Sequence, residues 1–178
     1  MIFRYTTGLY QLNLEIGKFE ALLNPNSISD HYFSYAFSPN GRYLVFANEI
    51  EKNIFYIRDM HTGRERKFEL NSKIENIGDF VWTRDGLKVI FVAGLNGWYY
   101  GKAGTSLYTF DTQTSTIDIL LYDDEEQRVP FFDWSLRNSD WLNSNMLHLI
   151  SAQKSFPDWF IDIRTGYVAP MLTYTPHP

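Results

Sequence analysis

An all-β fold made of repeated short sheets is predicted by three observations on the 178-residue sequence. The stretch FSPNGRYLVF (37–46) has the chemistry of a β-hairpin, because Pro39 presets a turn and Gly41 tolerates the left-handed backbone that follows. The unit recurs 45 positions later, from 37 to 82, as WTRDGLKVIF, which places Trp82 on Phe37. No segment carries an apolar 3.6-residue period long enough for a helix.

A second feature recurs with the same rhythm: an apolar and aromatic strand, an Asp or a neighbouring residue, a Thr-Gly turn or its equivalent, and another strand. Four copies align on Gly17, Gly63, Ser115 and Gly166, at spacings of 46, 52 and 51 residues. A period of about 40 to 50 residues is typical of propeller blades. The sequence therefore predicts a β-propeller or partial propeller in a single domain, 1–178, with about three complete four-stranded blades and an incomplete N-terminal one.

The first unit, 1–24, supplies three strands, at 2–5, 9–13 and 19–23, and nothing before Met1 provides an innermost strand. Such a sheet has an open edge that proteins normally cover or pair. Either the tail LTYTPHP or another polypeptide is expected to close it, although Pro176 and Pro178 in the tail cannot donate ladder hydrogen bonds.

The other three units, 31–70, 79–122 and 130–172, each divide into four short strands. The strands expected in the second are 31–37, 42–48, 53–59 and 65–70, and those in the third are 79–83, 88–93, 106–111 and 116–122. The strands expected in the fourth are 130–135, 146–152, 159–163 and 167–172, with a stretched first turn, LRNSDWLNSN. Phe37, Trp82 and Trp134 then occupy equivalent positions at the end of the innermost strand, where we expect them to pack between blades.

These two features resemble the TolB-type, WD-like β-propeller repeat, whose usual form is F-S-P-D-G-x-x-I-x-F followed by I-Y-x-x-D-x-x-T-G. The resemblance runs from about residue 9 to 172 and is most complete in FSPNGRYLVF and IFYIRDMHTG. The Gly-His and Trp-Asp dipeptides of true WD repeats are missing. The resemblance implies that the chain is built of propeller blades. In that family such repeats serve as binding platforms, as gating propellers of serine peptidases and as parts of periplasmic complexes.

The composition of the chain disfavours nucleic acid and membranes as partners. The net charge of −5 and the pI near 5.3 give no electrostatic reason to approach nucleic acid. The chain has no Cys, so it can form no disulfide. No apolar run approaches the roughly 20 residues that span a bilayer, so no membrane insertion is expected. A cytoplasmic location is the default expectation, with a periplasmic or exported location left open.

Motifs that carry chemistry are missing from the sequence. It contains no G-x-S-x-G, no phosphate-binding P-loop, no H-E-x-x-H and no G-x-G-x-x-G. The four His residues lack ligand spacing, and His148 is expected to be a packed or edge residue. We therefore expect no enzyme activity, no catalytic residues, no cofactor and no metal.

Candidate protein-binding residues lie in the predicted loops that join the second strand to the third and one blade to the next, which emerge on one face of a propeller. A Gly-flanked aromatic run and an acidic run stand out, and Phe156 beside Pro157 extends the set. Buried aromatics can anchor an interface, whereas the bland alternatives are rings folded back on the domain and a solvated acidic loop. The candidates are Trp98, Tyr99, Tyr100, Phe156, Asp123, Asp124, Glu125 and Glu126.

The leading functional hypothesis is a non-catalytic protein–protein interaction or scaffold module, which completes a larger propeller or complex with another protein or a second copy of itself. The alternative is the propeller portion of an enzyme, either the gating domain of a serine peptidase or a small hydrolase or lyase that uses carboxylates of the propeller funnel.

Overall fold

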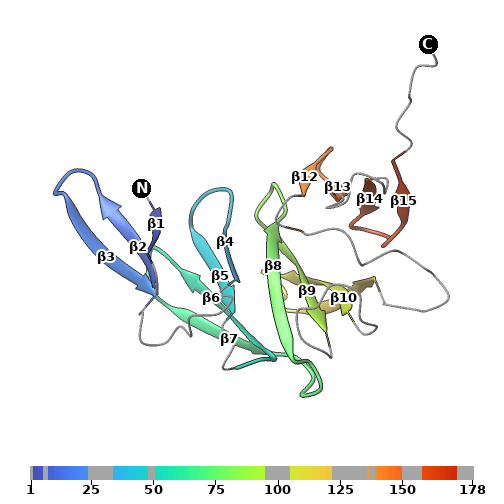
Figure 1. Ribbon diagram of the computed structural model, residues 1–178, viewed down its shortest axis with the longest axis horizontal. Helices are drawn as coiled ribbons and strands as arrows, with labels where there is room; N and C mark the ends of the chain where they lie inside the picture. Colours follow the sequence, from blue (N-terminus) through green and yellow to red (C-terminus); the bar gives the residue numbers. More distant parts are fainter. Residues whose placement is uncertain are drawn as a thin grey trace, which may run out of the picture.

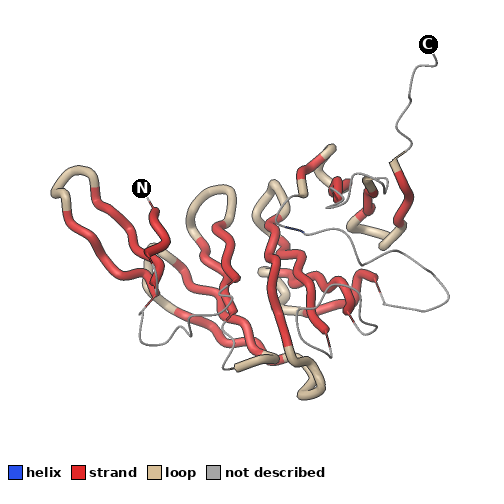
Figure 2. The backbone as a smooth tube through the Cα atoms, viewed as in Figure 1, coloured by secondary structure: helices blue, strands red, loops and turns tan. Residues whose placement is uncertain are grey.

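The computed structural model describes residues 2–5, 8–23, 34–47, 51–94, 105–121, 136, 139–149 and 158–171. Every regular element in these ranges that is longer than one residue is a β-strand (Figure 2). The strands form four antiparallel sheets, one of three strands and three of four strands, which follow one another along the molecule from the N-terminal to the C-terminal side (Figure 1). The predicted all-β class and propeller-like blades are confirmed.

The sheets are named here in chain order as the first to the fourth blade, and each is a simple meander in which consecutive strands pair. The first blade consists of β1 (Ile2–Tyr5), β2 (Gly8–Asn13) and β3 (Lys18–Leu23). The second consists of β4 (Ser34–Phe37), β5 (Tyr43–Ala47), β6 (Ile54–Asp59) and β7 (Glu65–Glu69). The third consists of β8 (Asn76–Trp82), β9 (Lys88–Gly94), β10 (Thr105–Asp111) and β11 (Ile117–Leu121). The fourth consists of β12 (Asp140–Trp141), β13 (Met146–Leu149), β14 (Trp159–Asp162) and β15 (Val168–Pro170).

The innermost strand of the fourth blade corrects the sequence-based expectation. The strand that pairs with β13 is β12, which lies inside the segment predicted as a stretched turn. Trp141 pairs with Leu147 in the same way that Trp82 pairs with Val89. Trp141 therefore takes the position assigned to Trp134, and Trp134 and the strand expected at 130–135 lie outside the described residues.

Alternating side chains of the central strands bury both faces of the third blade. In β9, Val89 and Phe91 pack toward the second blade, whereas Ile90 packs toward the fourth. The period-2 geometry of a strand explains how one short segment contributes to two cores. The core between the second and third blades is rich in aromatic rings, with Phe55 in contact with Phe91 and Phe110 at centroid distances of 5.2 and 5.5 Å.

The core between the third and fourth blades is aliphatic. Its buried members are Ile90, Leu107, Leu121, Leu136, Leu147, Leu149, Ile161 and Ile163. A smaller cluster, formed by Leu9 and Leu22 with Leu44 and Phe46, joins the first blade to the second. Each blade thus shares a core with the next, because a single short sheet cannot bury its own faces.

Two indole groups link the innermost strands of successive blades. Trp82 Nε1 donates to the Ala36 carbonyl at 3.1 Å, and Trp141 Nε1 donates to the Trp82 carbonyl at 3.1 Å. Trp82 is 5% exposed, and its ring stacks on Tyr43 at 6.3 Å. The expectation that Trp82 packs between blades therefore holds.

Candidate functional site

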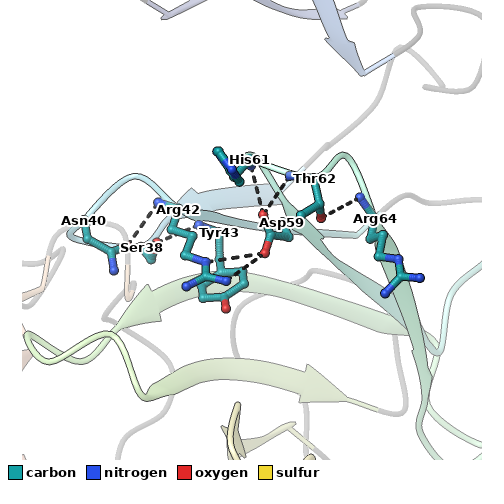
Figure 3. A network of polar contacts seen from close by, with 8 residues as sticks. All are labelled: Ser38, Asn40, Arg42, Tyr43, Asp59, His61, Thr62 and Arg64. Atoms are coloured by element: carbon teal, nitrogen blue, oxygen red, sulfur yellow. Dashed lines mark hydrogen bonds and ion pairs between the residues drawn. The ribbon is translucent and has the colours of Figure 1, made fainter.

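The turn after the first strand of the second blade is built by short polar side chains. The Ser38 hydroxyl donates to Asn40 Oδ1 at 2.8 Å and accepts the Tyr43 N–H at 2.8 Å, while Asn40 Oδ1 also accepts the Arg42 N–H at 3.0 Å (Figure 3). Gly41 has a φ of 68°, the left-handed conformation that the sequence predicted for it. These bonds explain how Ser38 and Asn40 hold the turn, and Gly41 supplies its left-handed residue.

The turn between the third and fourth strands is held by a carboxylate. Asp59 Oδ1 accepts the N–H groups of His61 at 2.9 Å and Thr62 at 3.0 Å (Figure 3). The same arrangement recurs at Asp111, which accepts the N–H groups of Gln113 and Thr114. The Asp of the D-x-x-T-G pattern therefore serves as a local backbone cap.

The two turns of a blade are hydrogen-bonded to each other, so they lie at the same end of each sheet. In the second blade the Met60 N–H donates to the Arg42 carbonyl at 2.7 Å, and in the third the Thr112 N–H donates to the Leu87 carbonyl at 2.9 Å. This end of the blades is called the turn side below.

An open groove of about 680 Å³ lies on the turn side, where the second blade meets the third. Residues of both turns of the second blade, of β7 and of the third blade line it. They are Arg42, Tyr43, Ile57, Asp59, Thr62, Arg64, Glu65, Arg66 and Thr112. Of the pockets in the described part of the chain, this groove is the one that we take as the candidate site.

Two of the three groove arginines are oriented by contacts with the protein. Arg42 donates from Nε and Nη2 to Asp59 Oδ2 at 3.4 and 3.3 Å, and its guanidinium lies 5.1 Å from the centroid of the Tyr43 ring. Arg66 donates to Ser115 Oγ at 3.2 Å across the groove and lies over the Phe68 ring at 5.5 Å. Stacking on a ring restricts a guanidinium while leaving its remaining N–H donors available.

Arg64 differs from the other two. Its backbone N–H donates to Thr62 Oγ1 at 3.3 Å, and no residue in the described part of the chain accepts a hydrogen bond from its guanidinium (Figure 3). The side chain is exposed and lines the groove.

The groove carboxylates do not neutralise these arginines fully. The N–H of Thr62, followed by that of His61 and the Arg42 guanidinium, lowers the pKa of Asp59, so that carboxylate is ionised and is engaged by Arg42. Glu65 is held by Arg58, whose Nη2 lies 2.8 Å from Glu65 Oε2. Among the described residues, Arg64 and Arg66 therefore face the groove without a carboxylate partner of their own.

The predicted protein-binding residues fall in segments that the structure does not describe. Trp98, Tyr99, Tyr100, Phe156, Asp123, Asp124, Glu125 and Glu126 all lie outside the described residues. The groove arginines were not among the candidates. A signal was nevertheless present, because Arg42 directly follows the FSPNG turn, Arg64 directly follows the Thr-Gly turn, and Arg66 comes two residues after Arg64.

Other polar clusters give little further chemistry. His148 on β13 pairs with Asp158, with Nε2 3.0 Å from Oδ2, which fits a packed residue held by a carboxylate. Within the described ranges no group of three or more His, Cys, Asp or Glu side chains is arranged to bind a metal ion. A search of the same residues finds no helix of the length and apolarity that a membrane crossing needs.

Comparison with known proteins shows which solved structures have a similar fold. No family model and no curated protein sequence matches the chain. Among solved structures, it is similar to TolB from Acinetobacter baumannii, with 15% identity and a TM-score of 0.57 over 90% of this chain and 36% of that one. It is also similar to an oligogalacturonate lyase from Vibrio parahaemolyticus, with 15% identity and a TM-score of 0.64 over 92% of this chain and 45% of the lyase. The tricorn protease gives 15% identity and a TM-score of 0.56 over 90% of this chain and 16% of the protease.

These likenesses define the class of fold, which is the β-propeller. The blades are TolB-like, as the repeat motif indicated. The chain spans less than half the length of each of these proteins, between 16% and 45%. At identities of 15% the likeness concerns the fold alone.

Proposed function

We propose that this chain is a non-catalytic interaction or scaffold module, made of WD-like propeller blades, that completes a larger propeller or protein complex. The observation that carries the proposal is the difference between the first blade and the others. In the described residues the first sheet has three strands and β1 has a neighbour on one side only, whereas the other sheets have four strands. An open strand edge accepts a further strand from another polypeptide or segment.

A second observation supports the same reading. The hairpin between β2 and β3 exposes three large apolar side chains: Leu14 is 69% exposed, Ile16 is 58% exposed and Phe19 is 64% exposed. All three belong to the blade that has the open edge. Exposed apolar groups that gather on one element are typical of interaction surfaces.

The test is the absolute mass of the purified chain, whose monomer is 20.9 kDa, by light scattering together with a pulldown of its partner. We expect a self-complex or a stable hetero-complex, and the double variant Trp98→Ala with Tyr100→Ala should abolish the partner's capture without unfolding the domain. Capture unchanged in that variant would remove this pair from the interface. A lone monomer that captures no protein would argue against the module itself.

The propeller portion of an enzyme is the second candidate. The specific observation in its favour is the half-buried His148 and Asp158 pair, because an imidazole oriented by a carboxylate is a general-base arrangement. The similar proteins include a lyase and a protease, but their identities of 15% carry no activity to this chain. An oligogalacturonate cleavage assay and a peptidase assay, each comparing the natural chain with His148→Gln, test this candidate.

A further inference from the structure

We propose that the groove between the second and third blades binds an acidic peptide segment, with Arg64 and Arg66 as the carboxylate-binding residues. This inference rests on the proposed function, because it names the chemistry of a partner for an interaction module. It concerns the turn side of the blades and uses none of the residues predicted as binding candidates from the sequence.

The charge distribution is the first argument. The chain carries a net charge of −5, yet three of the nine residues that line this groove are arginines. One of them, Arg42, is occupied by Asp59, and the other groove carboxylate, Glu65, is held by Arg58. Within the described ranges, the Arg64 and Arg66 guanidiniums have no carboxylate partner and can receive an anion, against the overall charge of the protein.

Pre-organisation is the second argument. Arg66 is stacked on Phe68 and uses one of its N–H groups on Ser115 Oγ. Arg64 follows the Asp59-capped turn, and its carbonyl accepts the Asp59 N–H at 2.8 Å, so its backbone is fixed while its guanidinium has no acceptor in the described residues. The stacked Arg66 guanidinium therefore loses little entropy on binding a carboxylate, whereas the exposed Arg64 side chain gives up rotamer freedom that its contact with the carboxylate must offset.

The mixed polarity of the lining favours a peptide over a simple anion. Thr62 and Thr112 present hydroxyl oxygens, and the Thr112 hydroxyl already donates to the Leu87 carbonyl at 2.8 Å, which leaves its lone pairs for an incoming N–H group. A peptide offers both N–H donors and carboxylate acceptors. The ionised Asp59 at the groove also opposes a dianionic phosphate more strongly than a singly charged carboxylate.

The experiment titrates the full chain into a fluorescein-labelled hexaglutamate peptide and follows anisotropy, with a hexaglutamine peptide as the uncharged probe. We expect binding of hexaglutamate alone, weakened as salt rises from about 0.05 M to about 0.5 M. The double variant Arg64→Ala with Arg66→Ala should bind about tenfold more weakly or worse, since it loses two charge-assisted contacts. Lys73→Ala removes one exposed positive charge outside the groove and should bind as the natural chain does.

Several outcomes overturn the inference. The first is that hexaglutamate does not bind at all. The second is that Lys73→Ala weakens hexaglutamate binding as much as the double arginine variant does. The third is that the double arginine variant, with an unfolding midpoint equal to that of the natural chain, binds hexaglutamate with unchanged affinity. Stronger competition by inorganic phosphate or a phosphoserine peptide than by hexaglutamate assigns the groove to phosphate and also refutes the peptide proposal.

The two proposals fail separately. Trp98→Ala with Tyr100→Ala should leave hexaglutamate binding unchanged, because the groove proposal rests on Arg64 and Arg66 and on neither aromatic residue. If the chain captures a partner but does not bind hexaglutamate, only the groove proposal is refuted. If the chain binds hexaglutamate but captures no partner in any pulldown, only the proposed role in completing a larger propeller or complex is refuted.

Discussion

The third and fourth blades differ in how their first hairpin is held. In the third, the Thr83 hydroxyl donates to Asp85 Oδ1 at 2.6 Å and accepts the Lys88 N–H at 2.9 Å, and β8 and β9 run for seven residues each. In the fourth, Leu142 stands where Thr83 is and has no hydroxyl, and the paired strand β12 has two residues.

The blades also differ in what fills the space beside them. Aromatic rings pack between the second and third blades, and aliphatic side chains pack between the third and fourth. In the third blade the turn bonds formed by side chains fix the register from which the ladder extends, and the fourth blade lacks the hydroxyl that forms them.

The largest expected effect is at Trp82. Trp82→Ala removes a 5%-exposed ring, its stack on Tyr43 and its bond to Ala36, and should lower the free energy of unfolding by about 3–5 kcal/mol in urea denaturation. Trp141→Ala loses the equivalent bond from a half-buried ring, so its cost should be smaller, about 2 kcal/mol. Equal costs would contradict the expectation that the contact between the second and third blades, where Trp82 is buried, is stronger than the contact between the third and fourth.

Gly166→Ala should be the next largest effect. Gly166 has a φ of 72°, and a Cβ there would lie 2.3 Å from the Leu120 carbonyl oxygen of the third blade, a backbone atom that cannot move alone. Gly63 has a φ of 70° with nothing within 4 Å of the same Cβ, so Gly63→Ala isolates the conformational cost of about 1 kcal/mol. Thermal unfolding of both variants should place Gly166→Ala about 2 kcal/mol below Gly63→Ala. Matching midpoints would refute a tight contact between the third and fourth blades.

Protonation distinguishes the second blade from the third. The Thr83 hydroxyl, then the Leu87 N–H, lowers the pKa of Asp85, whereas the second blade has the neutral Asn40 at that turn position. A lowered pKa contributes stability that is present above the unfolded value of about 3.9 and is lost as the pH falls through the folded value.

Asp85→Asn should therefore reduce the decline in unfolding free energy between about pH 5 and pH 2, while an amide oxygen keeps the turn bonds as Asn40 does. Urea midpoints measured across that range check it. Asn40→Asp should steepen the decline, and identical pH profiles for all three proteins would disprove the assignment.

The smallest effect is expected at Ser115, where φ is 59° in the position that glycine occupies in the other three blades. Ser115→Gly relieves the left-handed strain of a residue with a Cβ, at the cost of one exposed bond from Arg66 and of greater freedom in the unfolded chain. We expect a gain of about 0.5 kcal/mol by calorimetry. A loss of stability would mean that the bond across the groove outweighs the backbone strain.

The sequence predicted the architecture well where the repeat motif is complete. Strands expected at 42–48, 53–59 and 88–93 are observed at Tyr43–Ala47, Ile54–Asp59 and Lys88–Gly94, because turn residues and β-branched or aromatic runs agree there.

The innermost strand of the fourth blade could not be predicted in this way. Both Trp134 and Trp141 follow an Asp, and the bond that identifies Trp141 joins it to a carbonyl 59 residues away. Local sequence carries no information on a contact at that distance.

The groove was missed for a related reason. Arg42 and Arg64 are 22 positions apart, from 42 to 64, and line the same groove because the two turns of the blade are hydrogen-bonded. The rule that alternate turns of a meander lie at one end could have placed them together. The contribution of Thr112 from the next blade could not have been foreseen without the packing.

The indole links between blades have a consequence for how such a chain can change. Each tryptophan donates to a main-chain carbonyl, a group that every residue type supplies. Ala36 and Trp82, one small and one large, accept at the same distance of 3.1 Å. This hydrogen bond therefore constrains the residue type of the donor and not that of the acceptor, and the selectivity of each contact between blades comes from the side chains packed beside the indole.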